Sequence, residues 1–212
     1  MTEVYVAAGS NVEPERNLTL ASQELVRVFP DTRFSSWYRN PAVGFQGDDF
    51  INFVAGFSSD LPVHEVVRHL QAIETLCGRP RGAPRWAPRS MDLDILLYDA
   101  LICDEPKLKL PRPDLLKRAF MLGPLAELAP DLMHPTAGVT IRELWSRFDA
   151  AAHPMQKVPA MGQPGTGQPE VGQPEVGQPE VGQPEVGQPE VGQPSPSTSP
   201  RSGPRPPRES DR

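Results

Sequence analysis

Apolar residues follow two different spacings along the chain, and the spacing changes from one segment to the next. Leu18, Ala21 and Leu25 recur at the interval of a helix, whereas residues 4–8 form a short apolar run that is typical of a buried strand. The predicted strands cover residues 2–8, 33–38, 50–57 and 91–98, with a short β-pair within 101–110. The predicted helices cover residues 14–29, 62–77, 118–128 and 141–148. Asp60 is the expected N-cap of the second helix, and Gly78 marks its end.

The order of these segments favours an α+β fold. Strands and helices alternate irregularly, and the connections are too short for a doubly wound parallel sheet. We therefore expect a ferredoxin-like sandwich in which helices pack on a mainly antiparallel sheet. Residues 1–158 have the length of one ordinary domain with a single core.

The last part of the chain, residues 159–212, has a different composition. It contains 13 of the 27 prolines and 9 of the 17 glycines, and no aromatic residue follows Phe148. Five consecutive copies of Gly-Gln-Pro-Glu-Val occupy residues 167–191. Such a segment buries too little apolar surface to offset the entropy lost on ordering, so a disordered tail is predicted. A solvated repeat expansion and a specific binding segment are both open interpretations of its role.

Charge and cysteine content limit the class of protein. The formal net charge is −6 and is shared by both parts of the chain, so the broad basic face of a nucleic-acid binder is not predicted. The start, MTEVYVAAGSN, has no basic region before its apolar run, which predicts neither a signal peptide nor a membrane span. Cys77 and Cys103 lack metal or redox spacing, which suits a reducing compartment. We expect a cytoplasmic monomer without a nucleic-acid or membrane partner.

Charges of both signs are concentrated in residues 79–94. Four arginines occupy eleven positions, and Asp92 and Asp94 follow. Because alternate residues of a strand share one face, the two carboxylates should lie together, with Cα atoms about 7 Å apart. Mg²⁺ is held by one or two carboxylates plus substrate phosphates, and arginine forms bidentate bonds to phosphate. The pattern indicates a magnesium-nucleotide site. Two alternatives stay open here: an exposed Asp-Leu-Asp that only pairs with arginines, and a non-catalytic RNA- or nucleotide-binding module.

The segment RWAPRSMDLDILLYD resembles the signature of the 6-hydroxymethyl-7,8-dihydropterin pyrophosphokinase family of folate synthesis. Other segments fall in that family's order: AAGSN at 7–11, SSWYRNPAVG at 35–44, DFINFV at 49–54, QAIE at 71–74, LPRP at 110–113 and KRAFMLGPLAELAPDL at 117–132. The resemblance covers about residues 1–150. It implies transfer of diphosphate from MgATP to the hydroxymethyl oxygen of the reduced pterin, with AMP as the other product.

The resemblance also implies roles for individual residues. Asp92 and Asp94 would hold two Mg²⁺ ions, and Arg79 and Arg89 would assist the transfer. Residues on the ATP side would be Gln71, Glu74, Arg81, Arg85, Trp86, Ile95, Lys107, Lys109, Arg112 and Arg118. Residues on the pterin side would be Asn40, Pro41, Val43, Phe50, Asn52 and Phe120, with the pterin between the two phenylalanine rings.

Two positions depart from the pattern of the family. Phe50 stands where many relatives have tyrosine, and it keeps an aromatic face for stacking. Arg112 stands where a histidine that touches the ATP phosphates is usual. Arginine also donates to phosphate, but it is longer and permanently charged, so a family member that has become an inactive regulator is a further open alternative. Residues 9–11 are predicted to act mainly as a structural turn between the first strand and helix.

Overall fold

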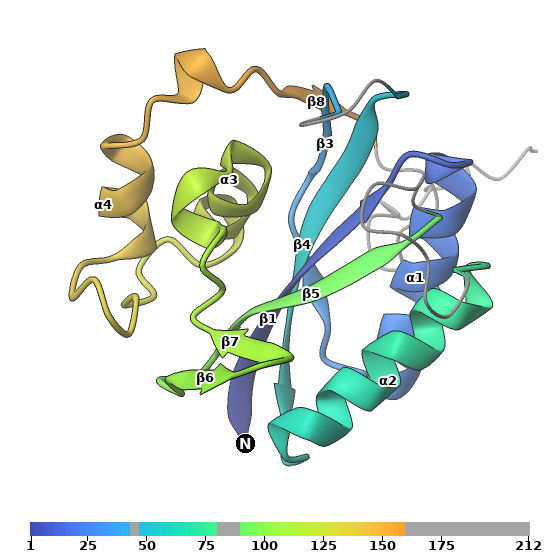
Figure 1. Cartoon of the computed structure of the whole chain (residues 1–212), viewed down its shortest axis with the longest axis horizontal. Coiled ribbons are helices and arrows are strands. Elements are labelled where there is room, and N and C mark those ends of the chain that lie inside the picture. Colours follow the sequence, from blue (N-terminus) through green and yellow to red (C-terminus); the bar gives the residue numbers. More distant parts are fainter. Residues whose placement is uncertain (43–46, 80–89, 160–212) are drawn as a thin grey trace, which may run out of the picture. The chain divides into compact units, whose positions relative to one another are not determined.

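The computed structural model describes residues 1–42, 47–79 and 90–159, and most of its strands form one sheet (Figure 1). The strands of the sheet are β1 (Thr2–Ser10), β2 (Arg33–Phe34), β3 (Trp37–Asn40), β4 (Phe50–Ser59), β5 (Asp92–Tyr98) and β8 (Gln156–Val158). A separate hairpin consists of β6 (Cys103–Glu105) and β7 (Leu108–Leu110). The α-helices are α1 (Pro14–Val28), α2 (Val63–Leu76), α3 (Ala119–Leu128) and α4 (Ile141–Ser146), with short 3₁₀ turns η1 (Leu115–Lys117) and η2 (Ala150–Ala152).

The strand order of the sheet is β5-β1-β4-β3-β8, with β2 beside β4. Every pairing among these described strands is antiparallel. Along the chain, the elements β1-α1-β3 and β4-α2-β5 repeat one strand-helix-strand unit, and the spatial order β5-β1-β4-β3 is that of a ferredoxin-like sandwich. The predicted α+β class and the mainly antiparallel sheet are therefore confirmed.

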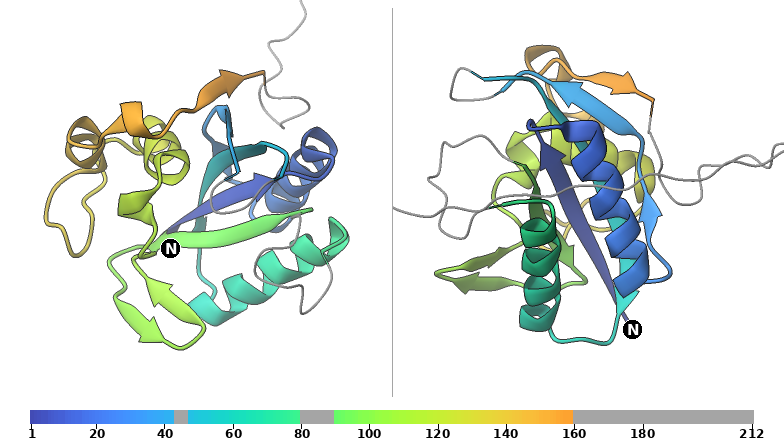
Figure 2. Two further views of the ribbon diagram at one scale, coloured as in Figure 1. Left: turned by 45° about the horizontal axis from the view of Figure 1, so that its top comes forward. Right: turned by 90° about the vertical axis from the view of Figure 1, so that its right-hand side faces the viewer.

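Helices cover both faces of this sheet, as Figures 1 and 2 show. α1 and α2 lie on one face, and α3 and α4 lie on the other. Each face has its own apolar cluster, the first with Leu18 and Phe57 and the second with Val54 and Leu122. Because β1 lies between the two clusters, its residues 4–10 are all buried. Burial on both faces explains why the apolar residues of the central strands do not alternate with polar ones.

Most predicted elements lie within two residues of the observed ones, but the predicted cap of α2 and the predicted strand 33–38 were wrong, and one strand was missed. Asp60 does not cap α2, because its carboxylate pairs with the N-terminal amine of Met1 at 3.2 Å and α2 has no side-chain cap. The predicted strand 33–38 is divided, because the Ser35 hydroxyl replaces a backbone carbonyl as the acceptor for the Val54 N–H, at 2.9 Å. β8 was not predicted at all, since its three residues carry no periodicity; it forms against β3.

The predicted repeat tail lies outside the described residues from residue 160 onward. Among the residues that are described, we find no helix with both the length and the apolar character that crossing a bilayer requires.

Candidate active site

Asp92 and Asp94 lie at the start of β5, the terminal strand of the sheet order. Their neighbours Leu93 and Ile95 are buried in the first apolar cluster, whereas the two aspartate side chains keep 22% and 32% of their surface exposed. This alternation puts both carboxylates on the same face of the strand. Two partly exposed carboxylates at this spacing match the ligands that Mg²⁺ takes from proteins.

Each of these carboxylates contacts an arginine. Arg79 Nη1 bonds to Asp92 Oδ1, and Arg112 Nη1 donates to Asp94 Oδ1 at 2.8 Å. The two positive charges offset the repulsion between carboxylates on alternate positions. The guanidinium groups that bind these carboxylates can equally bind phosphate oxygens. A polyphosphate entering here therefore meets donors that are already in place.

The end of α2 fixes the position of Arg79. Gly78 has a φ of +81°, a left-handed conformation that glycine adopts without the steric cost of a Cβ. The N–H groups of Gly78 and Arg79 donate to the carbonyls of Thr75 and Glu74, at 3.0 Å each, which makes this end a Schellman motif. Gly78 therefore ends the helix as predicted, and the turn brings Arg79 back to the Glu74 carboxylate.

Glu74 joins α2 to β5. Its Oε1 accepts the Leu93 N–H at 2.9 Å and also contacts Arg79 Nη1, and its side chain is only 13% exposed. Burial raises the pKa of Glu74 above its ordinary value, against the lowering effects of the Leu93 N–H and of Arg79, and the carboxylates of Asp92 and Asp94 also raise this pKa. Glu74 thus positions Arg79 and the start of β5.

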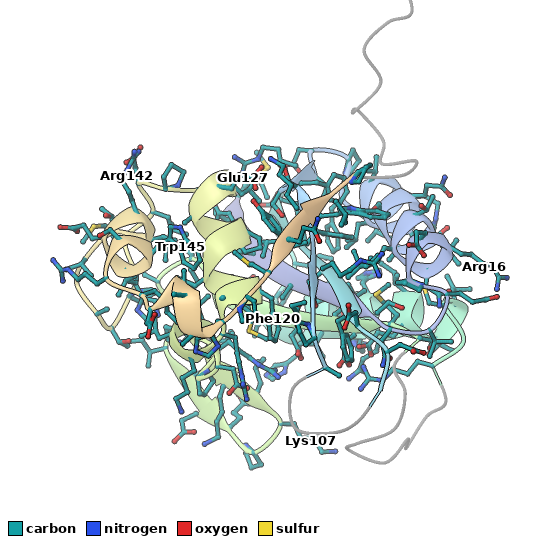
Figure 3. The ribbon with its side chains drawn as sticks, turned by 90° about the horizontal axis from the view of Figure 1, so that it is seen from above. Arg16, Lys107, Phe120, Glu127, Arg142 and Trp145 are labelled. Carbon is teal, nitrogen blue, oxygen red and sulfur yellow. The ribbon has the colours of Figure 1, made fainter. Side chains whose placement is uncertain are left out.

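A cavity of about 240 Å³, here called the basic cavity, opens beside Asp94. Its lining residues come from α2, β5 and the β6–β7 region: Val67, Leu70, Gln71, Glu74, Arg79, Leu93, Asp94, Ile95, Lys107, Leu108, Lys109 and Arg112. The lining has more cationic than acidic side chains, which favours an anionic ligand. Figure 3 labels Lys107 at the tip of the hairpin. Eight of the predicted site residues therefore meet in one cavity.

A second cavity of about 330 Å³, here called the apolar cavity, lies where the end of β3 meets the start of α3. Its lining residues are Asn40, Pro41, Arg118, Ala119, Phe120, Ala152, His153, Pro154 and Met155. Three residues predicted for the pterin, Asn40, Pro41 and Phe120, line it together. Arg118, which the sequence grouped with the ATP residues, lines this cavity and not the basic one. An apolar cavity with a few polar groups suits a flat heteroaromatic ring.

Two further residues predicted for the pterin, Phe50 and Asn52, lie on β4. Phe50 pairs in register with Asn40, and Asn52 Nδ2 donates to Asn40 Oδ1 at 2.6 Å. The Asn52 amide lies against Gly9 of β1, where an added methyl group would be only 2.5 Å from Asn52 Oδ1. Gly9 thus leaves room for the amide. The prediction that Gly9 acts as a turn between strand and helix was wrong, because Gly9 lies within β1.

Some of the predicted residues lie outside the described part of the chain: Val43, Arg81, Arg85, Trp86 and Arg89. Within the described ranges, no three His, Cys, Asp or Glu side chains form a group that could hold a metal ion. The carboxylate pair on β5 remains the candidate metal site. Sequence reasoning missed residues 152–155, because this short run carries no motif and reaches the apolar cavity only through the pairing of β8 with β3.

Known proteins similar to this chain include several pyrophosphokinases that are named for a hydroxymethyl-dihydropterin substrate. The family model for 7,8-dihydro-6-hydroxymethylpterin-pyrophosphokinase (HPPK) matches residues 5–130. The 2-amino-4-hydroxy-6-hydroxymethyldihydropteridine pyrophosphokinase of Pseudomonas aeruginosa is 40% identical over 136 residues, which are 62% of this chain and 83% of that one. The protein of the same name from Haemophilus influenzae is 35% identical over 162 residues, which are 74% of this chain and 99% of that one.

Solved structures give the same result for the fold. The Plasmodium falciparum HPPK-DHPS wild type with pterin and p-hydroxybenzoate superposes with a TM-score of 0.54 at 14% sequence identity. The match covers 71% of this chain and 43% of that longer chain. At this identity the likeness concerns the fold alone.

Proposed function

The chain belongs to the 7,8-dihydro-6-hydroxymethylpterin-pyrophosphokinase family, and from this membership we propose how its own residues perform the reaction. It is a pyrophosphokinase of folate biosynthesis, which transfers diphosphate from ATP to 6-hydroxymethyl-7,8-dihydropterin and leaves AMP. The observation that carries the residue assignment is the pair Asp92 and Asp94, each bonded to an arginine beside the basic cavity.

Asp92 and Asp94 would hold the Mg²⁺ that accompanies ATP, two ions in all. Their partial exposure leaves them accessible, and their spacing allows both to serve one polyphosphate. The metal, when bound, would neutralise charge on the phosphate oxygens. Arg79 and Arg112 would then exchange carboxylate partners for phosphate oxygens.

The basic cavity would bind the nucleotide. Lys107 and Lys109 supply further positive charge from the hairpin, while Gln71 and Ile95 line the same cavity from α2 and β5. The sequence resemblance alone assigns roles to four further residues. Closing over the bound nucleotide is assigned to Arg81, Arg85 and Trp86, and assisting the diphosphate transfer is assigned to Arg89.

The apolar cavity would bind the pterin. Phe120 lines this cavity and offers a ring for stacking. The polar edge of the pterin would bond to the amide of Asn40, which also lines the cavity, and to that of Asn52, which is not a lining residue but donates to Asn40 Oδ1 from β4. Pro41 adds an apolar wall, and Arg118 adds one positive charge, which suits the diphosphate that the pterin acquires.

In the transfer, the hydroxymethyl oxygen forms a bond to the β-phosphorus of ATP. The bond from the β-phosphorus to the oxygen shared with the α-phosphorus breaks, AMP leaves with that electron pair, and the hydroxyl proton is released. Charge spreads over the phosphate oxygens during this step. Glu74 and the two aspartates hold Arg79 and Arg112 beside the basic cavity in the free protein, so these arginines need only exchange partners to stabilise this charge.

Incubation of the full chain with MgATP and 6-hydroxymethyl-7,8-dihydropterin tests this function. We expect AMP and the pterin diphosphate in equal amounts, separated and quantified by chromatography. Formation of ADP, or no AMP at all, would contradict the proposal. RNA that bound tightly in a salt-dependent manner to an inactive chain would favour the RNA-binding alternative.

We also propose that residues 1–158 act as a monomeric catalytic domain in the cytoplasm, without a nucleic-acid or membrane partner. The sheet, both apolar clusters and both cavities are built from residues within this range. Light scattering coupled to size exclusion should give a mass near 23.3 kDa for the full chain. A mass near twice that value would contradict the monomer.

A further inference from the structure

Residues 152–155 form a wall of the apolar cavity that the sequence did not predict. They face the same space as Phe120 and Asn40, and they lie beyond the residues 5–130 that the family model matches. Figure 3 shows the segment that leads into β8, in orange, running beside α3 near the labelled Phe120. Pro154 and Met155 make this wall mainly apolar.

The downstream end of this wall is fixed by β8. Lys157 pairs with Tyr38 of β3, and Lys157 Nζ lies 3.6 Å from Glu127 Oε1 on α3. The Glu127 carboxylate also accepts hydrogen bonds from the hydroxyls of Tyr38 and Ser36, at 2.6 Å each. One carboxylate therefore ties α3, the β3 region and β8 together.

The upstream end of the wall is fixed by aromatic packing. Phe148 stacks on Trp145 with ring centroids 5.6 Å apart, and its centroid is 5.1 Å from that of the His153 ring. The Asp149 carboxylate accepts the Ala152 N–H at 3.3 Å and caps η2. The wall is thus held on both sides and spans the edge of the cavity between two anchors.

Gly123 of α3 provides the seat for Met155. A methyl group added at Gly123 would lie 2.5 Å from Met155 Cε and 3.0 Å from Trp145 Cη2. A glycine inside a helix is destabilising by about 1 kcal/mol relative to alanine, and a packing requirement commonly accounts for it. At this position the requirement is the close approach of Met155.

We propose that Met155, seated against Gly123, is a specificity-determining residue of the pterin site. This rests on the proposed function, which assigns the pterin to the apolar cavity. Because the wall is anchored at both ends, it limits the room beside the pterin ring and disfavours rings with additional substituents. Pockets discriminate by about 10-fold or more for one methylene group when their walls are fixed in this way.

Calorimetric titration of the full chain with 6-hydroxymethyl-7,8-dihydropterin tests the proposal, in the presence of Mg²⁺ and a non-hydrolysable ATP analogue. Met155→Ala should weaken pterin binding about 10-fold. It should also reduce the ratio of the affinity for the pterin to the affinity for a ring-methylated pterin. Met155→Leu, which conserves volume, should stay within about threefold of the wild type. Met133→Ala, a matched control at a side chain that is 53% exposed, should leave pterin affinity unchanged. The affinity for the ATP analogue should be the same in all variants.

If Met155→Ala does not fold, Gly123→Ala takes its place, since the added methyl group displaces Met155 and should also lower pterin affinity. Suppose that the wild type binds the pterin, and that the folded variants keep both its pterin affinity and its preference for the pterin over the ring-methylated one. That result would overturn the role of Met155 and leave the proposed function standing. A wild type that neither binds the pterin nor forms AMP would overturn the proposed function, and this inference with it.

Discussion

At the scale of single residues, the site depends on which cation each carboxylate binds. Arg79 follows α2 and Arg112 follows β7, yet each contacts one aspartate of β5. In the free protein these arginines act as counter-ions for the acidic pair. The proposed metal would compete with them for the same oxygens, while ATP would offer the arginines a new anionic partner.

Replacement of Asp92 or Asp94 by asparagine should lower kcat by about 100-fold or more while the fold is retained, because the amide keeps the shape but lacks the charge that holds Mg²⁺. AMP formation at saturating Mg²⁺ and the melting temperature are the two measurements. Asp131→Asn is the matched control, since this aspartate pairs with Arg142 at 2.9 Å and lines neither cavity. Near-normal turnover in either single variant would show that the metal assignment is wrong.

Replacement of Arg112 by glutamine should raise the affinity of the free protein for Mn²⁺, used as a probe for the metal site. One unit charge about 4 Å from a divalent ion contributes about 2 kcal/mol in a water-like environment, which corresponds to about 30-fold. The KM for ATP should rise in the same variant, because a phosphate donor is lost. Spin-resonance titration measures the first effect and steady-state kinetics the second.

Arg142→Gln is the control for this experiment, since Figure 3 shows Arg142 at the periphery of α4. If Arg112→Gln changes the KM for ATP but not Mn²⁺ affinity, Arg112 is a phosphate ligand only, and its bond to Asp94 has no influence on the metal.

At the scale of elements, strand register assembles the proposed pterin amides. Gly9 of β1 pairs with Asn52 of β4, and Asn52 in turn bonds to Asn40 of β3. Three neighbouring strands therefore contribute to one polar cluster. A shift of one residue would turn Asn52 to the opposite face of the sheet.

Alanine at position 9 should weaken pterin binding about 10-fold with a small change in melting temperature, because a site built to hydrogen-bond loses its alignment. The added methyl group meets the far end of the Asn52 side chain at 2.5 Å, so the side chain can move without the strand. A double-mutant cycle with Asn52→Ala supplies the control. The two effects should be strongly non-additive, and simple additivity would mean that Gly9 acts elsewhere.

His134 in the connection between α3 and α4 should make stability depend on pH. Its ring is buried, Nδ1 accepts the Ala137 N–H at 3.1 Å, and burial lowers the pKa of His134 below its ordinary value of 6.5. The unfolded chain therefore takes up a proton at this residue before the folded protein does. The contribution of neutral His134 to the free energy of unfolding is fully present above the pKa that this residue has in the unfolded chain. This contribution is lost as the pH falls through the lower pKa of His134 in the folded protein.

The free energy of unfolding should thus decrease as pH falls from 7 towards 5, by at most about 1.4 kcal/mol per pH unit for this one proton. His134→Asn should reduce this dependence, since its side-chain oxygen can still accept from the Ala137 N–H but takes up no proton. Urea unfolding of both proteins across this range makes the measurement. Equal pH slopes in the two proteins would assign the dependence to other groups.

At the scale of the whole molecule, local patterns predicted more of the structure than long-range contacts. Helical periodicity predicted α1 to α4 closely, and the charge pattern of residues 79–94 led to the acidic pair on β5. The bond between Arg112 and Asp94 could not be predicted, because it depends on how the β6–β7 hairpin returns the chain to β5. The seat of Met155 at Gly123 has no local signal either, since it depends on β8 reaching β3.

The repeat tail provides the last prediction at this scale. Removal of residues 159–212 should leave the melting temperature within about 2 °C and kcat and KM within about twofold, because this segment has no aromatic residue and few large aliphatic side chains to add to a core. Removal of residues 150–212 is the matched contrast, since it also takes away β8 and Met155. That shorter chain should lose pterin affinity. A large loss of stability or activity with the first deletion would show that the tail contacts the catalytic domain, contrary to its composition.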